Sequence, residues 1–381
     1  MVRIVRGDNS PEDLGTTSSE DTVIFGRGGN DTLQGGRGDD RLFGGAGDDT
    51  IVLSGGQDYY FGGPGDDTYV LESPSTAWNS KTLEDADAGF DVVEVSGRGW
   101  IGVAVAENVE RTIVDTNISF FWGSGNADAM NAENVSSSVT ILGYAGNDTI
   151  SGGSDNDLVD GGEGADVMRG GRGWDSYYVD NRGDRVIEDG GTESDFVDSS
   201  VSFVLPDLVE GLDLTGRAFS GIGNDLDNGI SGTDRANFLR GGAGDDVVRG
   251  QGGNDRLIGD LGDDLVWGGT GRDVMTGGQG EDVFLFLSEF DSGWRWQRAD
   301  RITDFDAAED IIDLTGVDAN TRFGDVQSFR FIGDDGFSGQ AGQLRLSPNF
   351  LVGDRNGDGR GDFFLRIGSA DEVEMTDALI L

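Results

Sequence analysis

Residues 241–285 read GGAGDDVVR, GQGGNDRLI, GDLGDDLVW, GGTGRDVMT and GGQGEDVFL, five consecutive nonapeptides that share one pattern. Glycine stands at the first and fourth places, aspartate at the sixth, and a large apolar residue at the eighth. We write the pattern GGxGxDxUx, where U is the apolar residue. A fixed internal period is typical of solenoid proteins, so this pattern decides the fold class before any single residue is considered.

The same pattern recurs elsewhere in the chain. One array covers residues 26–70, a second covers 143–178, and the third begins at residue 223 with two weaker copies. The frame is set on glycine and aspartate alone, and the eighth place then tests it independently. In a chain that is only 35% hydrophobic, every eighth place holds a large apolar residue: Leu33, Leu42, Ile51, Tyr60, Tyr69, Ile150, Val159, Met168, Tyr177, Ile230, Leu239, Val248, Leu257, Val266, Met275 and Phe284.

The letters of one repeat predict its conformation. Several glycines within six residues favour a tight turn, because glycine adopts positive φ at no steric cost. The three residues that follow form a short strand, with the eighth-place side chain pointing inward and its two neighbours outward. Two such units complete one coil, so the period in space is eighteen residues. Each coil buries only two large side chains, which predicts a thin core.

Composition excludes most other kinds of site. The chain has no histidine and no cysteine, which excludes a Ser-His-Asp triad, a cysteine nucleophile, and an imidazole or thiolate zinc site. It has 72 acidic residues, whose oxygens suit calcium. Stacked coils bring the sixth-place aspartates about 5 Å apart, where bare carboxylates repel each other. A divalent ion between them reverses that repulsion, so metal binding and folding become one event.

This motif resembles the RTX (repeats-in-toxin, haemolysin-type) calcium-binding repeat, whose fold is a parallel β-roll. The resemblance implies an all-β solenoid that binds Ca²⁺ through aspartates two repeats apart, with turn carbonyls completing the shell. Three pairs in the first array, two in the second and three in the third give about eight expected ions. Asn228 and Asn237 replace the aspartate in two repeats, and the count of eight includes no ion there. The family's carboxylate places fall on Asp31, Asp40, Asp49, Asp58, Asp67, Asp148, Asp157, Asp166, Asp175, Asp246, Asp255, Asp264, Asp273 and Asp282, and the carbonyls on turn glycines such as Gly35, Gly44, Gly62, Gly161, Gly241, Gly259 and Gly268.

We divide the chain accordingly. Two spacers separate the arrays, and each contains short alternating segments that predict strands. The segment after residue 285 is rich in predicted strands and resembles the C-terminal domain of serralysin-type secreted proteins. We expect it to cap the open end of the roll. The predicted parts are a lead-in (1–25), array one (26–70), a spacer (71–142), array two (143–178), a spacer (179–222), array three (223–285) and a β-rich cap (286–381).

The net charge and the C-terminal residues predict the protein's partners and its location. A net charge of −45 disfavours nucleic acid and anionic membranes as partners, and no run of eighteen apolar residues predicts a membrane span. The chain ends Asp377-Ala378-Leu379-Ile380-Leu381, an acidic residue before an apolar tetrapeptide, which resembles the C-terminal signal of type I secretion. A last β-strand explains the same residues. We therefore expect export by a type I secretion apparatus, from a Gram-negative bacterium, to the extracellular space.

No catalytic module is predicted. The chain lacks the HExxH motif of serralysin proteases and the GxSxG motif of RTX lipases. The leading hypothesis is therefore a secreted, calcium-folded structural, adhesive or binding protein. An alternative is a polysaccharide-binding or polysaccharide-modifying protein, since alginate epimerases carry similar rolls and Trp294 and Trp296 flank Arg295 in an acidic chain.

One further segment resembles a calcium site outside the arrays. Asp354, Asn356 and Asp358 are spaced like the first half of an EF-hand loop. The twelfth position is Leu365, where that loop needs a bidentate glutamate. The alternative is an acidic β-hairpin turn, with Asp362 as an additional candidate ligand.

Overall fold

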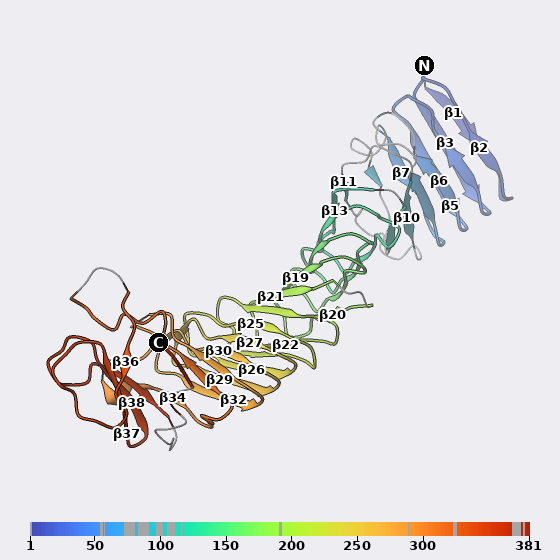
Figure 1. Cartoon of the computed structure of the whole chain (residues 1–381). Coiled ribbons are helices and arrows are strands. Elements are labelled where there is room, and N and C mark those ends of the chain that lie inside the picture. Colours follow the sequence, from blue (N-terminus) through green and yellow to red (C-terminus); the bar gives the residue numbers. More distant parts are fainter. Residues whose placement is uncertain are drawn as a thin grey trace. The chain divides into compact units, whose positions relative to one another are not determined.

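The computed structural model describes residues 2–53, 56, 58–71, 81–82, 91–96, 102–104, 111–115, 117–189, 193–288, 290–293, 295–322, 326–367, 375 and 378–381. It divides into two compact units, Met1–Asp195 and Phe196–Leu381, which are described separately. The named elements are short strands and one 3-10 turn, Trp296–Arg298 (Figure 1). The fold is all-β, as the sequence predicts.

The first unit is a parallel β-solenoid. The chain alternates between two sides of the coil, so strands that follow one another in sequence mostly lie in different sheets. One sheet contains, in order, β2 (Asp13–Gly15), β4 (Thr32–Gln34), β6 (Thr50–Leu53), β8 (Thr68–Leu71), β10 (Val92–Val95), β12 (Arg111–Val114), β14 (Ala129–Asn131), β16 (Thr149–Ser151), β18 (Val167–Arg169) and β20 (Arg185–Ile187). On the other side lie β1 (Arg3–Arg6), β3 (Thr22–Gly28), β5 (Arg41–Ala46), β7 (Tyr59–Phe61) and β9 (Lys81–Thr82), and then β11 (Gly102–Ala104), β13 (Phe120–Trp122), β15 (Thr140–Leu142), β17 (Leu158–Asp160) and β19 (Ser176–Val179).

The second unit repeats this arrangement. One side contains β21 (Phe196–Ser199), β23 (Gly211–Leu214), β25 (Gly229–Ser231), β27 (Val247–Arg249), β30 (Leu265–Trp267), β33 (Val283–Leu285), β35 (Ile311–Asp313) and β40 (Leu379–Ile380). The other side contains β22 (Phe203–Val204), β24 (Ser220–Ile222), β26 (Phe238–Ala243), β29 (Arg256–Leu261), β32 (Val274–Gln279), β34 (Asp300–Ile302), β39 (Phe363–Arg366), β38 (Phe350–Asp354), β37 (Gln343–Ser347) and β36 (Arg330–Phe331). A separate two-stranded pair is formed by β28 (Gly252–Gly253) and β31 (Thr270–Gly271).

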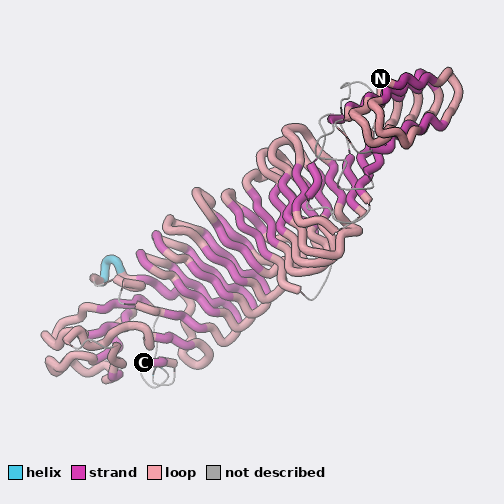
Figure 2. Tube along the Cα trace, turned by 90° about the horizontal axis from the view of Figure 1, so that it is seen from above, coloured by secondary structure: helices cyan, strands magenta, loops and turns pink. Residues whose placement is uncertain are grey.

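The register confirms the eighteen-residue coil. Thr32 pairs with Thr50, and Thr50 pairs with Thr68, all in parallel. In the third array Val247 pairs with Leu265 in the same way. The strands of successive coils consequently lie side by side along each unit (Figure 2). Described strands of the predicted spacers, such as β13 and β23, join the same sheets.

The core follows the eighth place of the repeat. All sixteen eighth-place side chains have a relative exposure of 0%. Apolar residues at the matching place in the spacers are buried as well, among them Phe121, Val197 and Leu212. Because each coil contributes so few large side chains, the apolar core is a narrow column, and the turns at its edges have to carry part of the stability.

The C-terminal segment closes the second unit. Strands β37, β38 and β39 form an antiparallel meander, and β39 pairs in parallel with β34. On the other side β40 pairs with β35, placing Leu379 opposite Ile312. Each stack of the second unit therefore ends on a strand from this segment, and the apolar tail predicted as a secretion signal also forms a last β-strand. Asp377 lies outside the described residues.

Candidate calcium sites

The sixth-place aspartates stand in rows, one residue before the strands. The backbone N–H of one aspartate donates to Oδ1 of the aspartate eighteen residues later. This distance is 2.7 Å from Asp31 to Asp49, 2.7 Å from Asp148 to Asp166, and 2.8 Å from Asp246 to Asp264. All fourteen predicted aspartates are buried, with exposures of 3% or less. One oxygen of each carboxylate thereby continues the hydrogen-bond ladder of the sheet through the turn.

The second carboxylate oxygen, Oδ2, accepts no hydrogen bond from the described residues in many of these turns. This Oδ2 is nevertheless buried from solvent. A buried carboxylate oxygen without a donor costs considerable free energy, so a turn that keeps one needs a cation or a proton. The aspartates of which this holds include Asp31, Asp49, Asp148, Asp166, Asp175, Asp246, Asp255, Asp264 and Asp273.

The leading glycine of each repeat leaves space beside that oxygen. A Cβ on Gly259 would lie closer than 3.0 Å to Oδ2 of Asp264 and to the carbonyl oxygen of Gly277. The backbone at Gly259 does not have positive φ, so space and not conformation requires the glycine. The same two neighbours, an own carboxylate and a carbonyl eighteen residues on, surround Gly26, Gly44, Gly143, Gly152, Gly241 and Gly250.

Most of the predicted carbonyls stand at this place. Five of the seven turn carbonyls face the space beside an aspartate Oδ2: those of Gly44, Gly62, Gly161, Gly259 and Gly268. The carbonyl of Gly241 faces the turn of Asn228 instead, and Gly35 is buried. Carboxylate and carbonyl oxygens around a space that admits no methyl group fit a hard divalent cation, and calcium above all. The role of these groups as ligands stays a prediction.

Burial raises the pKa of these carboxyl groups above the ordinary value of 3.8. The pKa of Asp148, Asp246 and Asp264 rises to about 7, and the pKa of Asp175 and Asp255 rises to about 8. Removal from water is the largest cause, neighbouring carboxylates add to it, and the backbone N–H at Oδ1 acts in the opposite direction. The folded chain therefore holds protons on these carboxyl groups more tightly than an exposed aspartate does.

Not all predicted turns have this open form. In three of them Oδ2 already accepts a hydrogen bond: from Gly36 N at 2.7 Å in the case of Asp40, from Tyr60 Oη at 2.6 Å for Asp58, and from Gly153 N at 2.6 Å for Asp157. These three stand on the same side of the first unit, before β5, β7 and β17. The two rows of this unit are therefore chemically different.

At the start of the third array, the side-chain amides of Asn228 and Asn237 form hydrogen bonds at the place of the aspartate. The Asn237 side chain accepts from Thr233 N at 2.7 Å and donates to the Ala218 carbonyl at 3.1 Å. Asn228 likewise donates to Val209 O at 3.2 Å. An amide supplies both a donor and an acceptor. It can therefore accept from a backbone N–H of its own turn and donate to a carbonyl oxygen one coil earlier, where the row has no preceding aspartate.

The rows extend beyond the predicted repeats. Asp67 N donates to Oδ1 of Asp91 at 2.9 Å, and Asp273 N donates to Oδ1 of Asp300 at 2.7 Å. Sequence reasoning missed these aspartates because their turns lack the glycines that set the frame. The signal that remains is an aspartate followed two places later by an apolar residue. It marks Asp91, Asp184, Asp195, Asp300 and Asp310, each of which accepts from the backbone one coil earlier, and Asp128, whose backbone N–H donates to Oδ1 of Asp148 one coil later.

The loop at 354–362 satisfies its own carboxylates. Asp354 is fully buried, and its Oδ1 accepts from Gly357 N at 2.7 Å while its Oδ2 accepts from Gly359 N at 2.9 Å. Asp362 accepts from Arg355 N and from the Asn356 amide, both at 2.8 Å. The loop follows β38 and leads to β39, as the hairpin interpretation predicts, and Ca²⁺ binding at these residues stays a prediction.

Comparison with known families assigns the arrays. Residues 16–51, 35–69, 140–180, 221–257, 231–266 and 250–284 match the family model of the RTX calcium-binding nonapeptide repeat. These are RTX calcium-binding nonapeptide repeats. The matched segments coincide with the three arrays found from glycine and aspartate spacing, so the resemblance drawn from the sequence is confirmed.

Two of the solved structures that are similar to this chain are bacterial proteins. The AlgE6R3 subunit of the Azotobacter vinelandii mannuronan C5-epimerase is 28% identical over 41% of this chain and 78% of that chain, with a TM-score of 0.19. The extracellular lipase LipA from Serratia marcescens is 15% identical over 77% of this chain and 45% of that chain, with a TM-score of 0.21. Because both TM-scores are low, neither contributes to the functional argument. A comparison with curated proteins gave no match.

Proposed function

We propose that this RTX repeat protein is a secreted, non-catalytic scaffold that folds when it binds Ca²⁺ outside the cell. One observation carries the proposal: buried aspartates present an unpartnered Oδ2 to a space bounded by a turn carbonyl and kept open by glycine. The same turn geometry recurs in successive coils of the arrays. Such repetition is expected of a binding scaffold and not of a single active site.

The energetics favour coupling of folding to calcium. A thin apolar column supplies little burial per residue, and 67 glycines increase the conformational entropy lost on folding. Rows of buried carboxylates add an electrostatic cost to the free energy of folding. Divalent ions in the rows remove that cost and cross-link neighbouring coils. Ion binding therefore contributes directly to the folding free energy.

Extracellular action follows from the ion. Sites of the extracellular class bind Ca²⁺ with Kd values of about 10⁻⁴–10⁻³ M, far above cytosolic calcium levels. A chain with such sites stays unfolded inside the cell and folds after export, which suits passage through a type I secretion channel. No cysteine has to be oxidised on the way. No helix among the residues described has the length and apolarity to cross a membrane.

Far-UV circular dichroism during a Ca²⁺ titration tests this function. We expect a cooperative gain of β signal at about 10⁻⁴–10⁻³ M Ca²⁺. Mg²⁺ at the same concentrations should give little, because it demands a smaller octahedral shell and keeps its water. A chelator should reverse the change. A chain that is fully folded in chelator at pH 8, with no response to Ca²⁺, would contradict the proposal.

A further inference from the structure

The second array ends on a turn that differs from the others of its row. Among the described predicted aspartates on that side of the first unit, Asp175 alone has an unpartnered Oδ2, and it is 1% exposed. Its Oδ1 holds the preceding coil by accepting from Asp157 N at 2.7 Å. No donor among the described residues meets Oδ2, so this buried oxygen is available as a ligand for a cation.

The residue opposite Gly170 explains the difference. Arg169 pairs with Ile187, so the leading-glycine place of the next coil on this path is occupied by Glu188. In seven array turns that place supplies a carbonyl oxygen, namely the turns that begin at Gly26, Gly44, Gly143, Gly152, Gly241, Gly250 and Gly259. Here a half-buried glutamate supplies a carboxylate as well, directly after β20.

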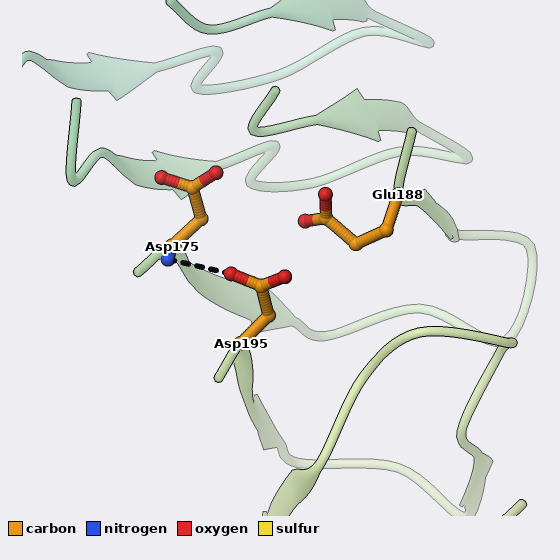
Figure 3. Close-up of side chains that lie close together, drawn as sticks. All are labelled: Asp175, Glu188 and Asp195. Atoms are coloured by element: carbon orange, nitrogen blue, oxygen red, sulfur yellow. Dashed lines mark hydrogen bonds between the residues drawn. The ribbon is translucent and has the colours of Figure 1, made fainter. Parts of the chain in front are cut away.

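One further carboxylate, that of Asp195, completes the cluster. Asp195 accepts from Asp175 N at 2.8 Å and is 7% exposed. One carboxylate oxygen from each of Asp175, Glu188 and Asp195 lies within 4.8 Å of the other two. Figure 3 shows the three carboxylates around a common space, with Glu188 approaching from a different strand end.

A buried tyrosine holds Glu188 in place. The hydroxyl of Tyr177 accepts from Gly170 N at 2.5 Å and donates to Oε1 of Glu188. Tyr177 is an eighth-place residue with 0% exposure, so its ring is fixed by the core. The glutamate is consequently positioned by the fold and is not a freely moving surface side chain.

We propose that Asp175, Glu188 and Asp195 form a three-carboxylate cation site at the end of the second array, distinct from the two-carboxylate sites of the repeats. Oxygen ligands alone select a hard divalent ion, and the bound ion is Ca²⁺. Affinity at calcium sites rises with the number of charged ligands, so this site fills at lower Ca²⁺ than the repeat sites. The inference rests on the calcium role proposed above and adds an order of loading to it.

Counting and titrating bound ions tests the site. Native mass spectrometry and calorimetry on the full chain would compare wild type, Glu188→Gln and a matched control, Glu163→Gln, which changes an exposed turn glutamate of the same array. With Ca²⁺ alone as the probe, we expect Glu188→Gln to lose one ion, or to weaken the tightest one at least tenfold. Glu163→Gln should match wild type.

The outcomes separate this inference from the general function. If wild type folds with Ca²⁺ and Glu188→Gln binds the same ions with the same affinities, the three-carboxylate site is wrong and the scaffold function stands. If wild type takes up no Ca²⁺, both are wrong. Should Glu188→Gln fail to fold in Ca²⁺, Tyr177→Phe decides, because Phe284 already occupies that place in the third array. We then expect one ion to weaken at least threefold, and no change would overturn the proposal.

Discussion

Gly259 and Gly229 both belong to the third array, yet only Gly259 stands beside a carboxylate. A Cβ at Gly229 would meet nothing within 4 Å, whereas a Cβ at Gly259 would collide with Asp264 Oδ2 and the Gly277 carbonyl oxygen. Neither glycine has positive φ. A comparison of the two alanine variants therefore isolates the space that the ion needs from the general cost of replacing glycine.

We expect Gly259→Ala to remove one Ca²⁺ or to weaken its binding at least tenfold, because the methyl group occupies the space between the two oxygens. Unfolding by urea in saturating Ca²⁺ should show a loss of about 1–3 kcal/mol, of the order found when a buried polar group loses its partner. Gly229→Ala is the control and should stay within about 0.5 kcal/mol of wild type, as surface changes usually do. Equal ion counts and equal stabilities would contradict the proposed geometry.

At the residue scale, the sequence predicts the aspartates but not how each oxygen is used. The spacing GGxGxD identifies Asp264 and its row, since the pattern repeats. It does not predict that Oδ1 accepts a backbone hydrogen bond while Oδ2 accepts none from the described residues, because that division depends on the backbone of the preceding coil. Asp300 shows a second limit of prediction from the sequence. It continues a row with both oxygens buried, yet it lacks the glycines that make a repeat recognisable.

At the scale of the coil, two short strands and two turns form one structural unit. Its regular length is eighteen residues in the arrays, and this follows directly from the sequence period. The register lengthens at the first spacer, where Thr68 pairs with Val92, and at the start of the C-terminal segment, where Val283 pairs with Ile311, and it shortens in the second spacer, where Phe196 pairs with Gly211. The extra residues are accommodated between strands, so the strands still pair. A nine-residue sequence frame does not detect such coils, because residues inserted in a turn shift the frame while the strands of neighbouring coils still pair.

The coil model predicts which side chains carry stability. Leu257 is fully buried in β29, whereas Arg249 is an exposed strand residue of β27. We expect Leu257→Ala to lower the free energy of unfolding in saturating Ca²⁺ by about 2–5 kcal/mol, because a thin column cannot close the cavity. Arg249→Ala should change it by less than about 0.5 kcal/mol. Urea denaturation of both variants provides the measurement, and a small loss for Leu257→Ala would show that the ions, and not the column, hold the coil.

At the scale of the molecule, charge sets the conditions for folding. The net charge is −45, and eight bound Ca²⁺ would leave about −29. Acidic self-repulsion therefore opposes the compact state even when the arrays are loaded. The raised carboxyl pKa values offer a second way to reduce that repulsion, since protons can occupy the buried rows when calcium is absent.

The direction of the pH effect follows from linkage. In the unfolded chain these carboxyl groups titrate near 3.8, and in the folded chain several titrate at about 6 to 8. A raised folded pKa means tighter proton binding in the folded state. Its contribution to stability is therefore complete below about pH 4 and is lost as the pH rises through about 6 to 8. In the absence of calcium, acidification should stabilise the fold, whereas calcium binding itself should weaken because protons compete for the same oxygens.

We expect the calcium-free chain to gain β signal in far-UV circular dichroism as the pH falls from 8 to 5, a range that stays above the sequence pI of about 4.1. Asp148→Asn supplies a neutral group in a buried row and should move the midpoint of this gain to higher pH, while it raises the Ca²⁺ concentration needed at pH 8. Asp155→Asn removes the same charge at an exposed position and separates general repulsion from the buried row. If acidification left the calcium-free chain unfolded, or if both variants shifted alike, protons would not be replacing calcium in the rows.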